Sequence, residues 1–147
     1  MKRFSFRLQK LLDIKKILEK DQRAALGEAQ RKLKKKQDEL NALLDEHRAL
    51  EDKWRDNLKE VLSADKLAMY TNYFTYLRNS EMEKAAEIIK LRQRVSECQA
   101  ILVKTLNEIK VLDKLYLSDY EEYLQEVKCE EEKDIGDLIS YRTALGT

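Results

Sequence analysis

The sequence predicts an all-α fold, a long two-helix antiparallel coiled-coil hairpin with a left-handed supercoil. Composition is the first observation: 39% of the 147 residues are charged, proline is absent and glycine occurs only three times. Chains of this kind contain little that would stop a helix once it has begun. The other two observations are a seven-residue apolar repeat in each half of the chain and opposite charges toward the two ends.

The first helix is expected over about residues 5–62, because apolar residues recur there in seven-residue steps. One series is Leu12, Leu26, Leu33, Leu40, His47, Trp54 and Val61, and the series three positions later is Ala29, Leu43 and Leu50. The residues that fit better one position out of phase are Leu8, Leu11, Ile14, Leu18 and Ala25. This slip predicts a stutter near residues 21–26. His47, the only histidine, is expected to be a polar seam residue that sets the register.

A tip is expected at about residues 63–69, where Ser63 can cap the following helix and Asp65 would lie in its first turn. The second helix is expected over about residues 70–142, because its repeat is more regular. Its two series are Phe74, Glu81, Ile88, Val95, Leu102, Ile109, Tyr116, Tyr123 and Leu77, Lys84, Leu91, Cys98, Thr105, Leu112. Residues 1–147 are therefore predicted to form a single coiled-coil domain.

The charge distribution favours a chain that folds back on itself. Residues 2–36 contain thirteen basic and four acidic residues, a net charge of +9, whereas residues 117–147 contain three basic and nine acidic residues, a net charge of −6. Such ends attract each other in an antiparallel hairpin and repel like ends in parallel pairing. We therefore expect a monomeric hairpin. The net charge of +1 for the whole chain gives no general preference for nucleic acid or anionic membranes.

The sequence contains no residue pattern typical of an enzyme. His47 has no second histidine or nearby cysteine with which to bind a metal, and no glycine-rich phosphate loop occurs. The longest purely apolar run covers residues 100–103, far short of the roughly 20 residues needed to span a bilayer. We expect a cytoplasmic protein without a cofactor, in which Cys98 and Cys129 are reduced thiols.

A basic run at residues 31–36 carries five positive charges in six residues and could contact phosphate groups. The simpler interpretation is a solvated helix face partly neutralised by Asp38 and Glu39. Aromatic residues for base stacking are missing from this run. Nucleic-acid binding is therefore only a minor alternative.

Residues 70–77, with the sequence YTNYFTYL, contain four aromatic side chains in eight positions. On the heptad ladder, Tyr70, Phe74 and Leu77 fall on or beside the seam. Tyr73 and Tyr76 point away from it. The stretch is therefore expected both to close the tip and to present an aromatic surface.

Three motifs, in order along the chain, resemble those of the flagellar type III export protein FliJ family. The first is the opening pattern formed by Phe4, Phe6, Arg7, Leu8, Gln9, Leu11, Leu12, Asp13, Ile14 and Lys15. The second is Tyr70, Tyr73, Phe74 and Leu77, and the third is the acidic tail followed by DIGDLISYR. The resemblance covers essentially the whole chain. The YscO-like proteins of virulence-associated type III secretion are similar in architecture and form a near alternative.

The resemblance implies a stalk-like protein, similar to the rotor stalk of the F-type ATPase gamma subunit. Proteins of this family insert into the ring of the flagellar export ATPase FliI and promote its hexamerisation. They also contact the cytoplasmic domain of the export gate FlhA and bind export chaperones that are empty of cargo. A non-enzymatic protein, peripherally associated with the inner face of the cell membrane at the flagellar base, is the expectation.

The family's gate-binding surface can be carried over by position. It would consist of Tyr73, Leu77, Ser80 and Lys84 on the second helix and Glu39, Leu43, Glu46 and Leu50 on the first. Ser80 replaces a residue that is usually small and apolar, and Glu46 and Leu50 stand where some members have tyrosine. Periodicity alone supports only a structural scaffold, in which the aromatic stripe is ordinary core, so this second function stays open.

Overall fold

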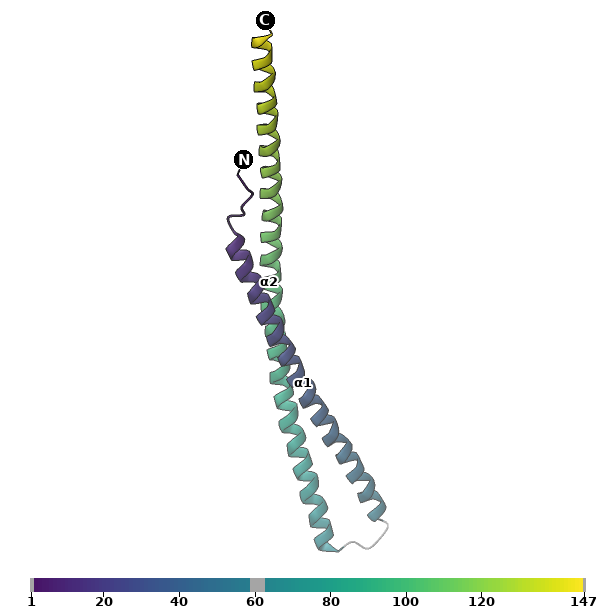
Figure 1. Cartoon of the computed structure of the whole chain (residues 1–147). Helices are drawn as coiled ribbons and strands as arrows, with labels where there is room; N and C mark the ends of the chain where they lie inside the picture. Colours follow the sequence, from purple (N-terminus) through teal and green to yellow (C-terminus); the bar gives the residue numbers. More distant parts are fainter. Residues whose placement is uncertain (1, 59–62, 147) are drawn as a thin grey trace. The chain divides into compact units, whose positions relative to one another are not determined.

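The computed structural model describes residues 2–58 and 63–146 and contains two helices, α1 (Gln9–Asn57) and α2 (Ala64–Leu145). The helices pack against each other, and the described residues form no strand. The predicted all-α, two-helix antiparallel hairpin is therefore confirmed (Figure 1). The hand of the supercoil stays a prediction. The chain divides into two compact units, unit 1 (Met1–Asp21 and Leu102–Thr147) and unit 2 (Gln22–Ile101), which are described separately below.

The seam of α2 follows the predicted seven-residue repeat. The buried members of the two predicted series are Leu77, Ile88, Cys98, Leu102, Thr105, Ile109 and Leu112. The remaining members of both series are half-buried. Because the residues that touch α1 recur at the heptad spacing, the register that the sequence predicts for α2 is the one in the structure.

The seam of α1 corrects the predicted stutter. Leu12 is only 3% exposed, whereas Leu11, Ile14 and Leu18 are exposed to solvent. The seam positions between Leu12 and Ala29 are occupied by Lys15, Glu19, Gln22 and Leu26, which are half-buried. The repeat therefore continues in one phase through residues 21–26. Polar side chains occupy several seam positions there, although the apolar stripe of Leu11, Ile14 and Leu18 lies one residue away.

An aromatic cluster closes unit 1 and delays the start of α1. Phe6 and Leu12 are buried with Ile109 and Leu112, and Phe4 packs against this core. The Phe4 ring lies 5.4 Å from the ring of Tyr116 and 5.2 Å from that of Tyr120, both edge-on. The Tyr123 hydroxyl donates a hydrogen bond to the Lys2 carbonyl at 2.9 Å. The aromatic residues before Gln9 are thus used as a non-helical plug, so α1 begins later than the predicted residue 5.

The loop end of unit 2 also differs from the sequence expectation. α1 ends at Asn57, before the predicted residue 62, and the predicted seam residue Val61 lies outside the described residues. α2 begins at Ala64 and so includes residues 64–69, which the sequence analysis assigned to the tip. Ser63 is the reason, because its Oγ accepts a hydrogen bond from the Lys66 amide at 3.3 Å and caps the helix. At its other end α2 extends to Leu145, three residues past the prediction.

The last part of α2 in unit 1 is uncovered. Contacts with the N-terminal segment reach Tyr123, and every residue from 128 to 146 is exposed. Among them are Ile135, Leu138 and Ile139, which are 56%, 63% and 59% exposed. Their spacing places them on one face of the helix, and Glu130, Asp134 and Asp137 lie away from that face.

Leu12→Ala is expected to lower the free energy of unfolding by about 2–4 kcal/mol, because truncating this buried side chain leaves a cavity in unit 1. Leu11→Ala is the matched control. It removes the same atoms from the neighbouring residue, which is 41% exposed, so the loss should be below about 1 kcal/mol. Urea denaturation followed by circular dichroism measures both values. Equal losses of unfolding free energy for Leu11→Ala and Leu12→Ala would contradict a seam that passes through Leu12.

Glu108→Gln is expected to lower the thermal midpoint at neutral pH but not in acid. The Lys15 ammonium lies 2.5 Å from the Glu108 carboxylate and holds the pKa of that carboxyl below its ordinary value of 4.5. A carboxyl with a lower pKa in the folded state stabilises the fold above its unfolded pKa. That contribution is lost as the pH falls through the folded pKa.

Thermal melts at pH 7 and pH 3 therefore provide the measurement. The midpoints of wild type and Glu108→Gln should differ at the higher pH and converge at the lower one. Glu121→Gln, at an exposed position of the same helix, serves as the control and should match wild type at both. A difference between wild type and Glu108→Gln that is as large at pH 3 as at pH 7 would exclude the ion pair as its cause.

Candidate functional site

The residues of the predicted gate-binding surface come together on one flank of unit 2. Tyr73 and Ser80 directly precede seam residues of α2, and Glu39 and Glu46 directly precede seam residues of α1. In an antiparallel coiled coil these positions face each other along the same side of the seam. We call this surface the Tyr73 flank, and it consists of Tyr73, Leu77, Ser80, Lys84, Glu39, Leu43, Glu46 and Leu50.

Two polar contacts join the two helices across the Tyr73 flank. The Tyr73 hydroxyl donates a hydrogen bond to the Glu46 carboxylate. The Lys84 ammonium donates to Glu39 Oε2 at 2.8 Å. Residues that are far apart in the sequence therefore form one continuous surface in the fold.

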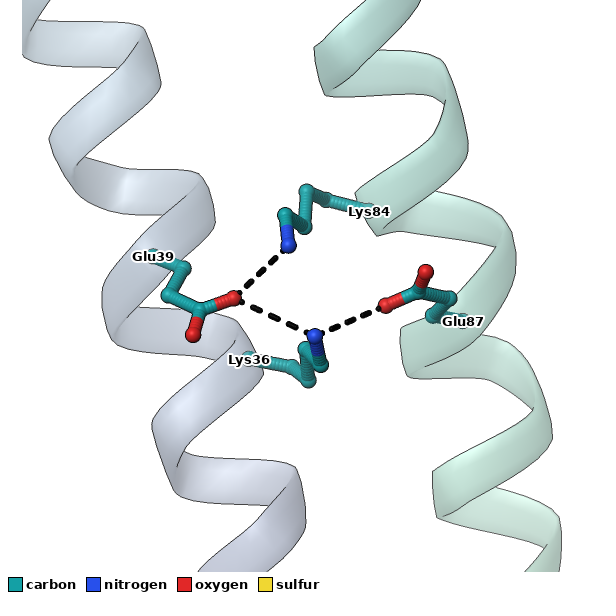
Figure 2. A network of polar contacts seen from close by, with 4 residues as sticks. All are labelled: Lys36, Glu39, Lys84 and Glu87. Carbon is teal, nitrogen blue, oxygen red and sulfur yellow. Dashed lines mark hydrogen bonds and ion pairs between the residues drawn. The ribbon is translucent and has the colours of Figure 1, made fainter.

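Two residues of this surface, Glu39 and Lys84, belong to a network of four charged residues that also includes Lys36 and Glu87 (Figure 2). Lys36 Nζ lies 3.1 Å from Glu87 Oε2 and 3.3 Å from Glu39 Oε2, so Glu39 contacts both lysines. The hydrogen bond from Lys84, followed by that from Lys36, holds the pKa of Glu39 below its ordinary value. Contact with Glu87 is the largest cause of the raised pKa of Lys36. The alternating charges match one register of the helices and disfavour others.

Burial divides the Tyr73 flank into accessible and inaccessible residues. Tyr73 is 37% exposed, whereas Leu77 is 0% exposed. Ser80, Lys84, Leu43 and Leu50 are half-buried. Leu77 therefore cannot touch a partner while the helices are packed. It holds the helices together beneath the surface that a partner could reach.

The aromatic stretch at residues 70–77 divides as predicted. The Trp54 ring lies 5.2 Å from Tyr70 and 6.4 Å from Phe74, both edge-on across the seam, and these two α2 residues are half-buried. The Tyr70 hydroxyl accepts a hydrogen bond from the Asn57 side-chain amide. Tyr73 and Tyr76 stack with their ring centres 6.1 Å apart, and Tyr76 is 61% exposed. One set of rings closes the seam, and the other is presented to solvent.

His47 lies in the seam of unit 2, half-buried, as predicted. Its Nδ1 is 2.7 Å from Glu81 Oε1 on the opposite helix, and its Nε2 is 3.3 Å from Glu51 Oε1 on its own helix. The ring also lies 5.5 Å from Phe74. Sequence reasoning did not pair His47 with Glu81. The signal was present, because both are polar residues at seam positions of facing helices.

A groove at the loop end of unit 2 was missed by the sequence analysis. It has a volume of about 720 Å³. Its lining residues are Leu50, Lys53, Asn57, Lys66, Met69, Tyr70, Asn72, Tyr73 and Tyr76. The sequence predicts Lys66 and Met69 in the tip, so it does not predict that they lie on a helix face beside Tyr73 and Tyr76. Their spacing of seven residues from Tyr73 and Tyr76 is the pattern that could have revealed it.

The basic run at residues 31–36 is partly neutralised. Lys32 pairs with Glu28 at 3.4 Å, and Lys36 belongs to the network described above. Arg31, Lys34 and Lys35 border an open depression that also includes two acidic side chains. This mixed arrangement favours the solvated helix face over a nucleic-acid surface.

Within the described ranges, 2–58 and 63–146, no three His, Cys, Asp or Glu residues are grouped so that they could hold a metal ion. Over the same ranges, neither helix includes a stretch that is long and apolar enough to cross a membrane. Cys98 is buried, Cys129 is exposed, and both are free thiols. The groups with recognisable chemistry are thus the aromatic and charged side chains of the Tyr73 flank and the groove.

Comparison with known proteins gives a family for the chain. No curated protein and no solved structure matches it. A family model described as "Flagellar FliJ protein" matches residues 4–144, a range that includes the N-terminal plug, the Tyr73 flank and most of the uncovered end of α2. Because the match covers nearly the whole chain, the protein belongs to the FliJ family and has a role associated with flagellar type III export.

Proposed function

We propose that this protein is a non-enzymatic stalk of the flagellar type III export apparatus that links the export ATPase FliI to the cytoplasmic domain of the export gate FlhA. Family membership supports the export role. The observation that carries the proposal is the meeting of both halves of the predicted gate-binding surface on the Tyr73 flank, through the Tyr73–Glu46 and Lys84–Glu39 contacts.

The accessible aromatic residues of the Tyr73 flank suit recognition of a protein. Tyr73 is held by Glu46 and stacked on Tyr76, so its ring is already oriented before a partner arrives. A tyrosine that is fixed in this way loses little conformational entropy on binding. Tyrosine is also among the residues that contribute most to protein interfaces. The gate is therefore proposed to contact Tyr73 directly, with Ser80, Lys84, Leu43 and Leu50 around it.

Unit 1 has the features expected of the ATPase-binding end. The last turns of α2 are exposed and amphipathic, with Ile135, Leu138 and Ile139 open to solvent. A helix with an uncovered apolar stripe gains free energy when a partner buries that stripe. We propose that this segment enters the ATPase ring and contacts several subunits, which would promote hexamerisation. Association with the membrane at the flagellar base would follow from these contacts. Export chaperones empty of cargo are further proposed partners.

A generic scaffold is the second candidate function, and the complete burial of Leu77 favours it for part of the aromatic motif. A scaffold needs Leu77 and the seam but not the exposed Tyr73 ring. The YscO-like alternative receives less support, because the matching family model is the flagellar one. Substitutions at Tyr73 and Leu77, four residues apart, distinguish the gate-binding function from the scaffold function.

Tyr73→Ala is expected to weaken binding to the purified gate domain by roughly tenfold or more while lowering the thermal midpoint less than Leu77→Ala does, because Tyr73 is 37% exposed and Leu77 is fully buried. Leu77→Ala should instead lower the free energy of unfolding by about 2–4 kcal/mol. Calorimetric titration, thermal melts and the motility of a complemented null strain measure these effects. Met82→Ala, at an exposed residue of α2 outside both the Tyr73 flank and the groove, is the control. Full gate binding and motility with Tyr73→Ala would leave only the scaffold function.

Removing residues 128–147 is expected to abolish co-elution with the export ATPase, because the shortened chain lacks the exposed apolar stripe of α2. Binding to the gate domain should persist, since the Tyr73 flank lies in unit 2. Size-exclusion chromatography with each purified partner provides the measurement. Retention of ATPase binding by the shortened chain would overturn the role given to this segment.

A further inference from the structure

The groove at the loop end of unit 2 extends the Tyr73 flank beyond the residues carried over from the family. Leu50 and Tyr73 belong to both surfaces, and Met69, Tyr70 and Tyr76 add further apolar wall. Met69 is 70% exposed, and Tyr76 is 61% exposed. Grooves of about 300–1,000 Å³ with mostly apolar walls are typical binding sites, and this groove has about 720 Å³.

Two lysines of the groove form no ion pair with any residue that the structure describes. Elsewhere along the facing helices, Lys15, Lys36 and Lys84 each contact a glutamate of the opposite helix. Lys53 and Lys66 line the groove from α1 and α2, and neither ammonium forms an ion pair with another residue in the described part of the chain. Among the residues described, no acidic side chain lines the groove. Within residues 22–58 and 63–101, opposite charge for these two lysines is therefore missing and can come from a ligand.

The groove combines an aromatic wall with a pair of unpaired cations. An aromatic or long aliphatic side chain would be buried by the tyrosines and Met69, whose flexible thioether adapts to irregular shapes. Carboxylates that flank such an anchor would pair with Lys53 and Lys66, one on each helix. A nucleic acid fits less well, because the groove offers only Lys53 and Lys66, whereas proteins that bind single strands follow the phosphate backbone with an extended positively charged groove.

We propose that this groove binds an acidic peptide segment with an aromatic or long aliphatic anchor residue, presented by the cytoplasmic domain of the export gate. The inference rests on the proposed function and adds Lys53, Lys66, Met69 and Tyr76 to the surface that the gate contacts. The anchor fills the groove, while the acidic residues of the segment set its orientation across the two helices. The two lysines thereby select for acidic sequence around the anchor.

Charge reversal with a matched control tests the proposal. Lys53→Glu/Lys66→Glu in the full chain should weaken binding to the purified gate domain by roughly tenfold or more, and Tyr76→Ala should weaken it by a similar factor. Arg48→Glu/Arg78→Glu changes the net charge equally at exposed positions of the same two helices that do not line the groove. This control should bind within about twofold of wild type. Thermal melts check that all variants fold.

The outcomes separate this inference from the function on which it rests. A wild-type chain that fails to bind the gate domain would overturn both. Binding by wild type together with equal binding by Lys53→Glu/Lys66→Glu would overturn the groove alone. Equal weakening by the arginine control would show a general charge effect and would also overturn the groove. A single-stranded oligonucleotide that displaces the gate domain from the wild-type chain would assign the groove to nucleic acid and contradict the acidic peptide.

Discussion

The register in which α1 and α2 face each other is the constraint on which the rest of the structure depends. Two helices without a third layer bury only a narrow seam, so apolar packing alone distinguishes poorly between registers one heptad apart. Charged contacts at the edge of the seam favour one register over its alternatives. Lys15–Glu108 does so in unit 1, and the network that includes Lys36 and Glu87 does so in unit 2. A slip by one heptad would place these groups beside different neighbours and lose the pairing.

Polar residues within the seam add to this specificity at a cost in burial. His47 and Glu81 occupy seam positions where leucine would bury more apolar area, yet they pair with each other at 2.7 Å. The candidate surface depends on the same register. Tyr73 reaches Glu46 only when the helices are aligned in this way, and the two walls of the groove come from α1 and α2. Shape and recognition are therefore set by the same contacts.

The sequence predicted the period of the seam but not everywhere its phase. In α2 the heptad series is long and mostly apolar, so the fold class and the buried face could be read directly. In the first turns of α1, the apolar stripe of Leu11, Ile14 and Leu18 is stronger than the true seam, which uses Lys15 and Gln22. Pairing across the helices decides between these faces, and a single-helix pattern contains no information about it. The same limit explains the missed groove and the missed non-helical plug.

The aromatic motif at residues 70–77 shows why a matching motif is not by itself a binding site. A helix turns by about 100° per residue, so adjacent members of one motif face different surroundings. Leu77 is fully buried and Phe74 packs near Trp54, whereas Tyr73 and Tyr76 stack on the outside. The stability of the seam accounts for the buried residues, whereas packing across the seam does not account for the exposed rings. The exposed pair lies beside Lys53 and Lys66, so the part of the motif that packing does not explain is also the part that meets unpaired charge.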